Sequence, residues 1–275
     1  MKKILFVLLV VTSIVSAQKR NITLEEIWSG AFRTEGLNEL NSMQGDYYTL
    51  LDFNRETRST SVDKYSYLTL EKVETIVDSK NLTELNYFET YSFNNNETKL
   101  ILGVDIEPIY RHSTLGIYFT YDIATKILEL IDDDKIQEPT FSPDSKKVAY
   151  VKGNNIYIKN LETNQLFQIT KDGEKNEIIN GICDWVYEEE FSFVKAFEWS
   201  TDSKHIAFLR FDESEVPTFS MDITGKELYP TQQVFKYPKA GEKNSIVTLH
   251  IYSTEAKTTS RIDLGNYEYI PRIKW

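Results

Sequence analysis

Short segments in which apolar and polar residues alternate fill most of the chain and predict antiparallel strands. From residue 46 onward such segments cover residues 47–53, 65–70 and 73–77, with polar turns between them. Residues 155–158 and 249–252 repeat the pattern further along. Since few stretches show helical spacing, the predicted fold class is all-β.

One short helix is predicted before the strands begin. Thr23 is followed three residues later by Glu26, the spacing of a capping box in which each side chain satisfies a free amide of the first turn. The helix is expected to run through about Ser29. Residues 18–45 are therefore interpreted as a helical and linker segment.

A longer repeat organises the strands into units. Residues 141–150, beginning Phe-Ser-Pro-Asp-Ser-Lys, are echoed about 58 residues later by residues 199–208, beginning Trp-Ser-Thr-Asp-Ser-Lys. A weaker echo, residues 93–102, precedes the first by about 48 residues. Each copy continues with further strands, which gives four-stranded antiparallel blades and predicts a partial β-propeller over residues 46–275.

The sequence holds roughly four such blades. Residues 269–275 resemble the opening of another unit. Because blades at the end of an open array leave apolar faces uncovered, we expect the chain to be part of something longer.

The composition is typical of a folded β protein and excludes some classes of binding partner. The chain has 275 residues, 41% of them hydrophobic, including 17 Tyr and 15 Phe, so a sizeable core is available. Its net charge of -11 argues against nucleic acid or an anionic membrane surface as a partner. The single cysteine, Cys183, cannot form a disulfide within the chain and is predicted to be a buried structural residue rather than a nucleophile.

The first 17 residues are typical of an export signal. Lys2 and Lys3 form a positive start, residues 4–15 are apolar, and Val15-Ser16-Ala17 is a small-residue cleavage site. A periplasmic or extracellular location is predicted, with no membrane anchor after cleavage.

Residues 184–191, Asp-Trp-Val-Tyr-Glu-Glu-Glu-Phe, are the main candidate for chemistry. Three adjacent glutamates repel one another, and aromatic neighbours would lower the local dielectric and hold the carboxylates in fixed directions. Such a group would attract an ammonium or guanidinium strongly. The alternative is a solvated acidic turn, which is the more common fate of a charge run.

A family resemblance adds detail to this candidate. Residues 181–191, together with Tyr110-Arg111-His112-Ser113 and with Tyr-Pro-Lys-Ala-Gly at residues 237–241, closely resemble the N-terminal propeller of the dipeptidyl peptidase IV family, in the prolyl oligopeptidase clan of serine peptidases, here in a bacterial form. The resemblance covers most of the chain after the signal.

The resemblance implies roles for individual residues. Glu189 and Glu190 would bind the free α-ammonium of a peptide substrate, and Arg111 would contact the carbonyl of its second residue. The alternative for Arg111 is a structural ion pair on a blade surface. Supporting positions are assigned to the following residues: Trp185, Tyr187 and Glu188.

The implied activity is that of a secreted serine exopeptidase releasing X-Pro or X-Ala dipeptides from peptide N-termini. This sequence shows no Gly-x-Ser-x-Gly elbow, so the catalytic α/β-hydrolase domain and its triad are expected to lie outside the chain, which alone is predicted to be inactive. No metal or organic cofactor is implied. Two alternatives remain, a non-enzymatic periplasmic propeller used for binding or scaffolding and a tripeptidyl peptidase of the same clan.

One more segment has a meaning within the resemblance. Residues 211–241 are longer than a simple hairpin connection and resemble the arm through which these enzymes dimerise, which makes a homodimer the expected state of the full-length protein. The alternative is a mobile surface loop.

Overall fold

Two units make up the chain, residues 1–38 and residues 39–275. The computed structural model describes residues 21–34, 36 and 40–275, so the predicted export signal lies outside the described residues. In the first unit, helix α2 (Leu24–Trp28) begins with the predicted capping box: the Thr23 hydroxyl accepts from the Glu26 amide, and the Glu26 carboxylate accepts from the Thr23 amide. No described helix is long and apolar enough to cross a membrane.

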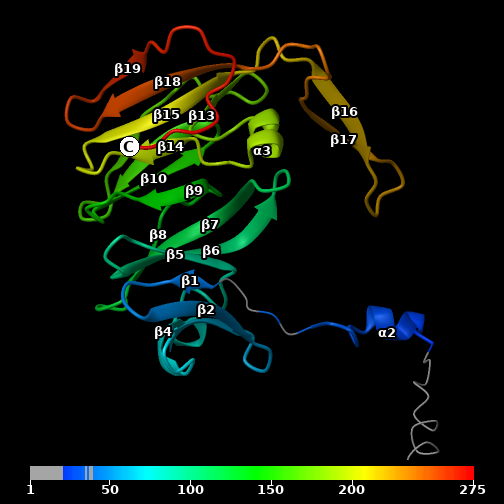
Figure 1. Cartoon of the computed structure of the whole chain (residues 1–275), viewed down its shortest axis with the longest axis vertical. Coiled ribbons are helices and arrows are strands. Elements are labelled where there is room, and N and C mark those ends of the chain that lie inside the picture. Colours follow the sequence, from blue (N-terminus) through cyan, green and yellow to red (C-terminus); the bar gives the residue numbers. More distant parts are fainter. Residues whose placement is uncertain (1–20, 35, 37–39) are drawn as a thin grey trace, which may run out of the picture. The chain divides into compact units, whose positions relative to one another are not determined.

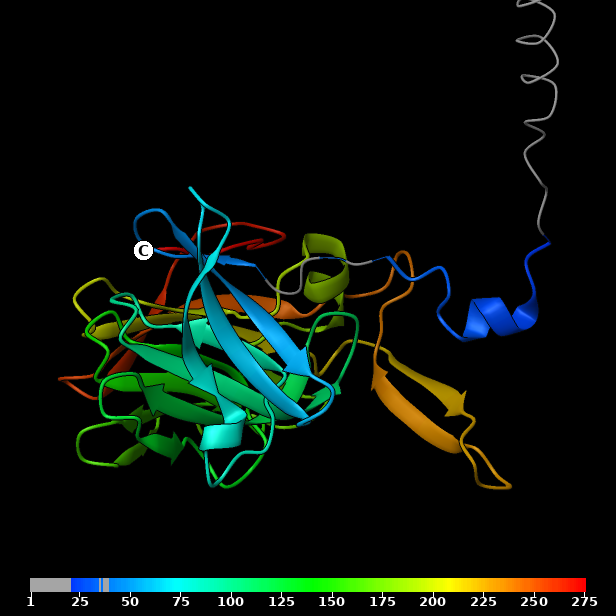
Figure 2. The same cartoon turned by 90° about the horizontal axis from the view of Figure 1, so that it is seen from below.

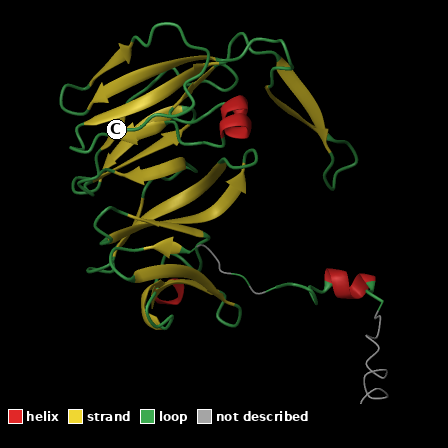
Figure 3. Cartoon of the chain, viewed as in Figure 1, coloured by secondary structure: helices red, strands yellow, loops and turns green. Residues whose placement is uncertain are grey.

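The second unit is built from antiparallel sheets that follow one another along the chain (Figures 1 and 3). The first sheet contains β1 (Asn41–Ser42), β2 (Tyr47–Asn54), β3 (Ser59–Ser66) and β4 (Lys72–Asp78), with a short 3-10 helix, η1 (Ser79–Asn81), after it. The second contains β5 (Thr90–Phe93), β6 (Lys99–Pro108), β7 (Thr114–Asp122) and β8 (Leu128–Leu130). The third contains β9 (Gln137–Phe141), β10 (Lys147–Lys152), β11 (Asn155–Asn160) and β12 (Leu166–Gln168).

Along the chain, the strands of the fourth sheet are interrupted by a helix and by a hairpin. The sheet contains β13 (Ile178–Asn180), β14 (Phe197–Trp199), β15 (His205–Asp212), β18 (Ile246–Ser253) and β19 (Thr258–Ile262). Helix α3 (Trp185–Phe191) lies in the connection from β13 to β14, and a separate hairpin of β16 (Thr218–Ile223) and β17 (Thr231–Lys236) lies between β15 and β18. The arrangement is an open array of propeller blades, as the repeat predicts, with four strands in each of the first three and five in the fourth.

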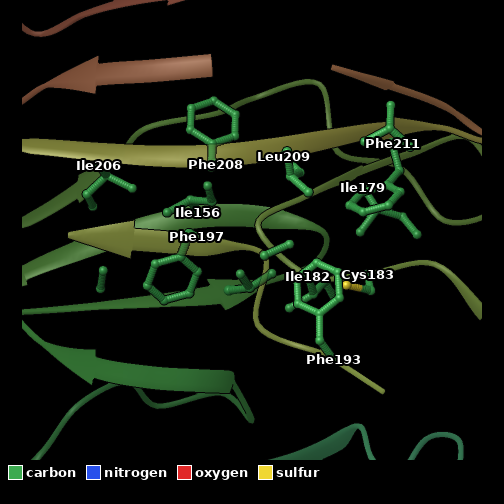
Figure 4. Packing of buried hydrophobic residues seen from close by; sticks show 14 of the residues in the cluster. Ile156, Ile179, Ile182, Cys183, Phe193, Phe197, Ile206, Phe208, Leu209 and Phe211 are labelled. Carbon is green, nitrogen blue, oxygen red and sulfur yellow. The ribbon is translucent and has the colours of Figure 1, made fainter. Parts of the chain in front are cut away.

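The apolar core lies between neighbouring blades, because the middle strands bury both faces. On β6, Leu100 and Leu102 pack toward the first blade, whereas Ile101 packs toward the third. On β10, Tyr150 belongs to the layer shared with the second blade, and Val151 belongs to the layer shared with the fourth. Figure 4 shows part of this last layer. Successive side chains of a strand point to opposite faces of the sheet. A middle strand that packs against a blade on each side is therefore apolar at consecutive positions.

The repeated sequence forms the turn between the two innermost strands of a blade. Ser142 accepts the Lys147 amide at 3.0 Å, and Ser200 accepts the His205 amide at 2.8 Å in the equivalent position. Ser203 occupies the left-handed region with φ of 61°, as does the equivalent serine one blade earlier. The serine and aspartate of the repeat thus close the same turn twice.

These turns also join one blade to the next. The hydroxyl of Ser203 accepts the amide of Asp144 at 3.0 Å, and the hydroxyl of Ser145 accepts the amide nitrogen of the Asn94 side chain at 2.8 Å. The repeat therefore fixes the spacing between blades as well as the turn inside each one.

Three sequence predictions need correction. The strand predicted over residues 65–70 lies earlier, at Ser59–Ser66, because Leu70 adopts a positive φ of 59° and the segment before it forms a turn. Residues 269–275 form no strand in the described structure; Ile270 instead donates its amide to the hydroxyl of Tyr187 at 3.0 Å. The acidic string, for which the sequence analysis predicts no helix, forms the helix α3.

The hairpin of β16 and β17 stands away from the blades in both views (Figures 1 and 2). Its strands pair from Thr218 with Lys236 to Ile223 with Thr231, and it forms a sheet of its own. At its base the buried ammonium of Lys236 donates to the carbonyls of Ser214 and Val216, at 3.3 and 2.9 Å. The long connection seen in the sequence is therefore an ordered two-stranded arm.

Candidate functional site

Helix α3 positions the acidic string, and its own sequence explains why it forms. Asp184 is the N-cap, with its carboxylate accepting the Tyr187 amide at 2.9 Å, and Ser192 ends the helix in a left-handed conformation with φ of 52°. Consecutive helical residues are rotated by about 100°. The three adjacent glutamates therefore point in different directions, which relieves the repulsion expected of an extended acidic run.

Tyr187 fastens the helix to the core. Its side chain is 2% exposed, and its ring contacts Phe191 and Phe211 with centroids 5.0 Å away in each case. Burial raises the pKa of Tyr187 to about 12, so its hydroxyl stays protonated while accepting the Ile270 amide. The inner face of α3 is thus held by one aromatic residue that sequence reasoning assigned a supporting position.

Glu188 faces inward and holds the turn that precedes β7. Its side chain is 1% exposed, and the oxygen Oε1 accepts the amides of His112 at 2.6 Å and Ser113 at 2.8 Å. A buried carboxylate with two amide donors forms charge-assisted hydrogen bonds. These bonds fix the backbone on one side of Arg111, so Glu188 places that residue next to the helix.

Glu189 and Arg111 are brought together. The Nε atom of Arg111 lies 3.1 Å from Oε2 of Glu189, with the Arg111 side chain 70% exposed and that of Glu189 16% exposed. Arg111 therefore forms an ion pair whose partner belongs to the acidic string. Besides Nε, the guanidinium carries two terminal NH₂ groups as further donors.

Glu190 follows Glu189 at the exposed side of the helix. Within the described part of the chain, no cationic side chain forms an ion pair with it. Trp185 lies at the other end of the helix, where its ring meets that of Tyr237 at 4.5 Å. The structure thus brings Arg111 and Glu189 together, leaves Glu190 exposed at the next helical position, and places Trp185 beside Tyr237, the residue that follows β17.

Sequence reasoning missed two contacts that hold this arrangement. The hydroxyl of Ser245 donates to the buried carboxyl group of Asp184, 61 residues away in sequence. The ring of Tyr110 packs against Phe235 of the arm at 5.8 Å. The capping role of Asp184 has a local signal in the sequence, because an aspartate stands directly before the aromatic and acidic segment. The contacts with Ser245 and Phe235 have no such signal. Cys183 is buried as expected, and burial raises the pKa of its thiol.

Comparisons with known proteins point to one family. The family model described as "Dipeptidyl peptidase IV (DPP IV) N-terminal region" matches residues 94–275. A probable dipeptidyl-aminopeptidase B of Pyrenophora teres f. teres is 32% identical over 93% of this chain and 32% of its own length. One from Arthroderma gypseum is 40% identical over 56% of this chain and 18% of its own length.

Two solved structures resemble the chain. The crystal structure of Porphyromonas gingivalis dipeptidyl peptidase 4 matches with a TM-score of 0.84 and 36% identity, covering 92% of this chain and 37% of the other. A putative dipeptidyl aminopeptidase IV from Bacteroides ovatus has a TM-score of 0.55 at 19% identity, which shows a shared fold. The chain spans about a third or less of the length of the curated relatives described above.

Proposed function

The chain belongs to the dipeptidyl peptidase IV family, and we propose that it is the substrate-recognition propeller of a secreted serine exopeptidase that releases X-Pro or X-Ala dipeptides. The observation that carries the proposal is the pairing of Arg111 with Glu189 on a turn clamped by Glu188. The pairing supports the proposal because it sets a carboxylate beside a mostly exposed guanidinium, with the exposed Glu190 next in the helix, and a peptide N-terminus needs such acceptors for its ammonium and such donors for its carbonyl.

In the proposed complex, the free α-ammonium of the substrate lies between Glu189 and Glu190. Each charge-assisted hydrogen bond contributes about 1.5 to 3 kcal/mol. An acylated N-terminus lacks the positive charge and would leave both carboxylates without a cation. Recognition therefore depends on a free amine.

Arg111 has two roles in this proposal. Without substrate, its guanidinium neutralises Glu189, with Nε 3.1 Å from the carboxylate. With substrate, its remaining donors bind the carbonyl of the second residue, because a planar guanidinium can serve a carboxylate and a carbonyl together. The distance from amine to carbonyl then sets how many residues are cut off.

Hydrolysis is assigned to a part of the full-length protein outside this chain. A serine there attacks the carbonyl after the second substrate residue, and water then hydrolyses the acyl-enzyme. A homodimer formed through the β16–β17 arm and export from the cytoplasm belong to the same proposal. The arm supports the dimer proposal because it carries exposed apolar side chains, among them Met221, Ile223 and Val234.

The proposal is tested with the full-length protein and the variant Glu189→Ala on chromogenic dipeptidyl and tripeptidyl substrates. Losing one ammonium contact lowers kcat/KM for the dipeptidyl substrate by about 10- to 150-fold, which corresponds to about 1.5 to 3 kcal/mol. The matched control is Glu162→Ala, an exposed glutamate paired with Lys146 on a distant turn.

Each possible result has a clear meaning. Unchanged activity in Glu189→Ala would remove the ammonium-binding role. Faster cleavage of tripeptidyl than dipeptidyl substrates would favour a tripeptidyl peptidase. Binding of peptides without hydrolysis by the full-length protein would favour a non-enzymatic binding module.

A further inference from the structure

A cavity of about 730 Å³ lies beside the N-terminal end of α3, and neither Arg111 nor Glu189 nor Glu190 lines it. Its walls come from the segment before Arg111, from the start of α3, from residues 173–176 and from the arm residues 231–235. Ile179, Ile182 and Cys183 line it from the core layer shown in Figure 4. Its volume is within the range of about 300 to 1,000 Å³ that holds small ligands.

Glu213 is the unusual residue of this cavity. It lines the cavity and is only 6% exposed, yet no donor among the described residues forms a hydrogen bond with its carboxyl group. Lys236 lies close enough to influence it, but the Lys236 ammonium is engaged by the carbonyls of Ser214 and Val216. The carboxyl oxygens of Glu213 are not among the fully enclosed atoms without a partner, so they remain accessible to a donor from outside the protein.

Glu213 lies among mostly acidic groups: Glu174 and Asp184 line the cavity with it, and Lys175 is the cationic residue of the lining. Asp184 and Glu177 both act on Glu213 with negative charge, and Lys236 is the cation that acts against them. Asp184 already accepts the Ser245 hydroxyl and the Tyr187 amide, so its hydrogen-bonding capacity is used by the helix. Glu213 is therefore the acceptor left for a ligand.

The walls combine aromatic and aliphatic side chains with polar ones such as Gln137, Asn154 and Gln233. Tyr110, Trp185 and Phe235 line the cavity together with aliphatic side chains, and the rings of Tyr110 and Phe235 are 5.8 Å apart. Burial raises the pKa of Tyr110 to about 12, with Glu213 contributing, so its hydroxyl stays neutral and adds no charge to compete with the carboxyl group. Aromatic faces attract cations and exclude anions.

We propose that this cavity is a second ligand site, distinct from the surface of Glu189 and Glu190, which binds a small organic ammonium with an apolar body and places its charge at Glu213. The ammonium supplies the donor that Glu213 lacks. The apolar body fills the space between the arm and the start of α3. The proposal stands whether or not the recognition role of Glu189 is correct.

Ligand binding at this site is linked to a proton. Burial raises the pKa of Glu213 to about 8, with Asp184 and Glu177 adding to the effect and Lys236 opposing it, so the empty site is mainly protonated at pH 6 to 7. An ammonium stabilises the ionised form, and its binding therefore releases a proton. The affinity rises roughly tenfold for each pH unit between pH 6 and 7 and levels off above the pKa.

The test uses phenethylammonium as the probe and isothermal titration calorimetry of the full-length protein. The probe stays charged over the pH range used, as a lysine does. The background variant Glu189→Gln with Glu190→Gln removes the other ammonium site. In that background we expect a remaining site whose affinity rises with pH as described, and phenethyl alcohol, which has no charge, binds at least about tenfold more weakly.

Adding Glu213→Gln, which preserves the size of the side chain, is expected to weaken the binding of phenethylammonium at least about tenfold. It is also expected to abolish the pH dependence of the affinity. The pH series on the background variant needs no change at Glu213, so it tests the proposal even if Glu213→Gln folds poorly. No binding in the background variant, or binding that is independent of both pH and Glu213, would overturn the proposal. Neither result would affect the assignment of Glu189, which the peptidase assay tests separately.

Discussion

The blade turns and the α3 region use the same chemistry over very different sequence distances. In the turns, Ser142 accepts the amide of a residue five positions away. In the α3 region, Glu188 accepts the amide of Ser113, 75 positions away. The difference shows that the propeller is specified by local repeated signals, whereas the candidate site depends on blades that have already packed.

The largest effect is expected at Glu188. Glu188→Ala removes the acceptor of two buried amides and should lower the free energy of unfolding by about 3 kcal/mol, while releasing the turn that carries Arg111. Urea denaturation measures the first effect, and KM for a dipeptidyl substrate of the full-length protein measures the second.

The matched control is Glu188→Gln. Both amides bind the single oxygen Oε1, so a glutamine retains both acceptor contacts and loses only the charge. Glu188→Gln should lower the free energy of unfolding by about 1 kcal/mol. Equal losses in the two variants would contradict the view that Glu188 acts as a hydrogen-bond clamp.

A smaller effect is expected in the blade turns. Ser203→Ala removes the acceptor of the Asp144 amide, and Ser145→Ala removes the acceptor of Asn94. Each should cost about 1 kcal/mol of unfolding free energy and leave KM unchanged. A change in KM without a change in the free energy of unfolding would contradict the view that these turns stabilise the blades without affecting the candidate site.

The smallest effect concerns Asp122, at the end of β7. Lys99 and the amide of Thr125 hold the pKa of its carboxyl group down to about 2, below the value of about 3.9 in an unfolded chain. Its stabilisation is therefore complete above pH 4 and is lost as the pH falls toward 2.

Asp122→Asn removes this contribution. Since the side chains of the pair are 30% and 25% exposed, solvent screening limits the loss at pH 7 to about 1 kcal/mol or less. Denaturation midpoints of the two proteins should converge between pH 4 and pH 2. A difference that persists at pH 2 would contradict the assignment to Asp122.

The sequence predicts the parts of this molecule whose causes are local. The capping box at Thr23, the repeat turns and the alternation within strands each depend on neighbours a few residues away, and all three are present. The prediction for one strand is wrong, at residues 65–70 instead of 59–66. The positive φ of Leu70 ends the alternation in a turn, and the pattern of apolar residues does not reveal this conformation.

The candidate site was only partly predictable. Arg111, Glu189 and Glu190 were selected through their resemblance to a family, and the structure brings Arg111 and Glu189 together. The helical form of the acidic string depends on Asp184 and on Tyr187 packing in the core, and the inward orientation of Glu188 depends on a turn from another blade. Such long-range contacts leave no periodic pattern in the sequence.

The central claim is that α3 recognises a free peptide amine, and one comparison tests it most directly. The affinity of a catalytically inactivated full-length protein is measured for a peptide with a free N-terminus and for its N-acetylated form. The wild-type protein is expected to prefer the free amine by at least about tenfold, and Glu189→Gln with Glu190→Gln is expected to reduce this ratio to near one. A ratio unchanged by the double substitution would contradict the account.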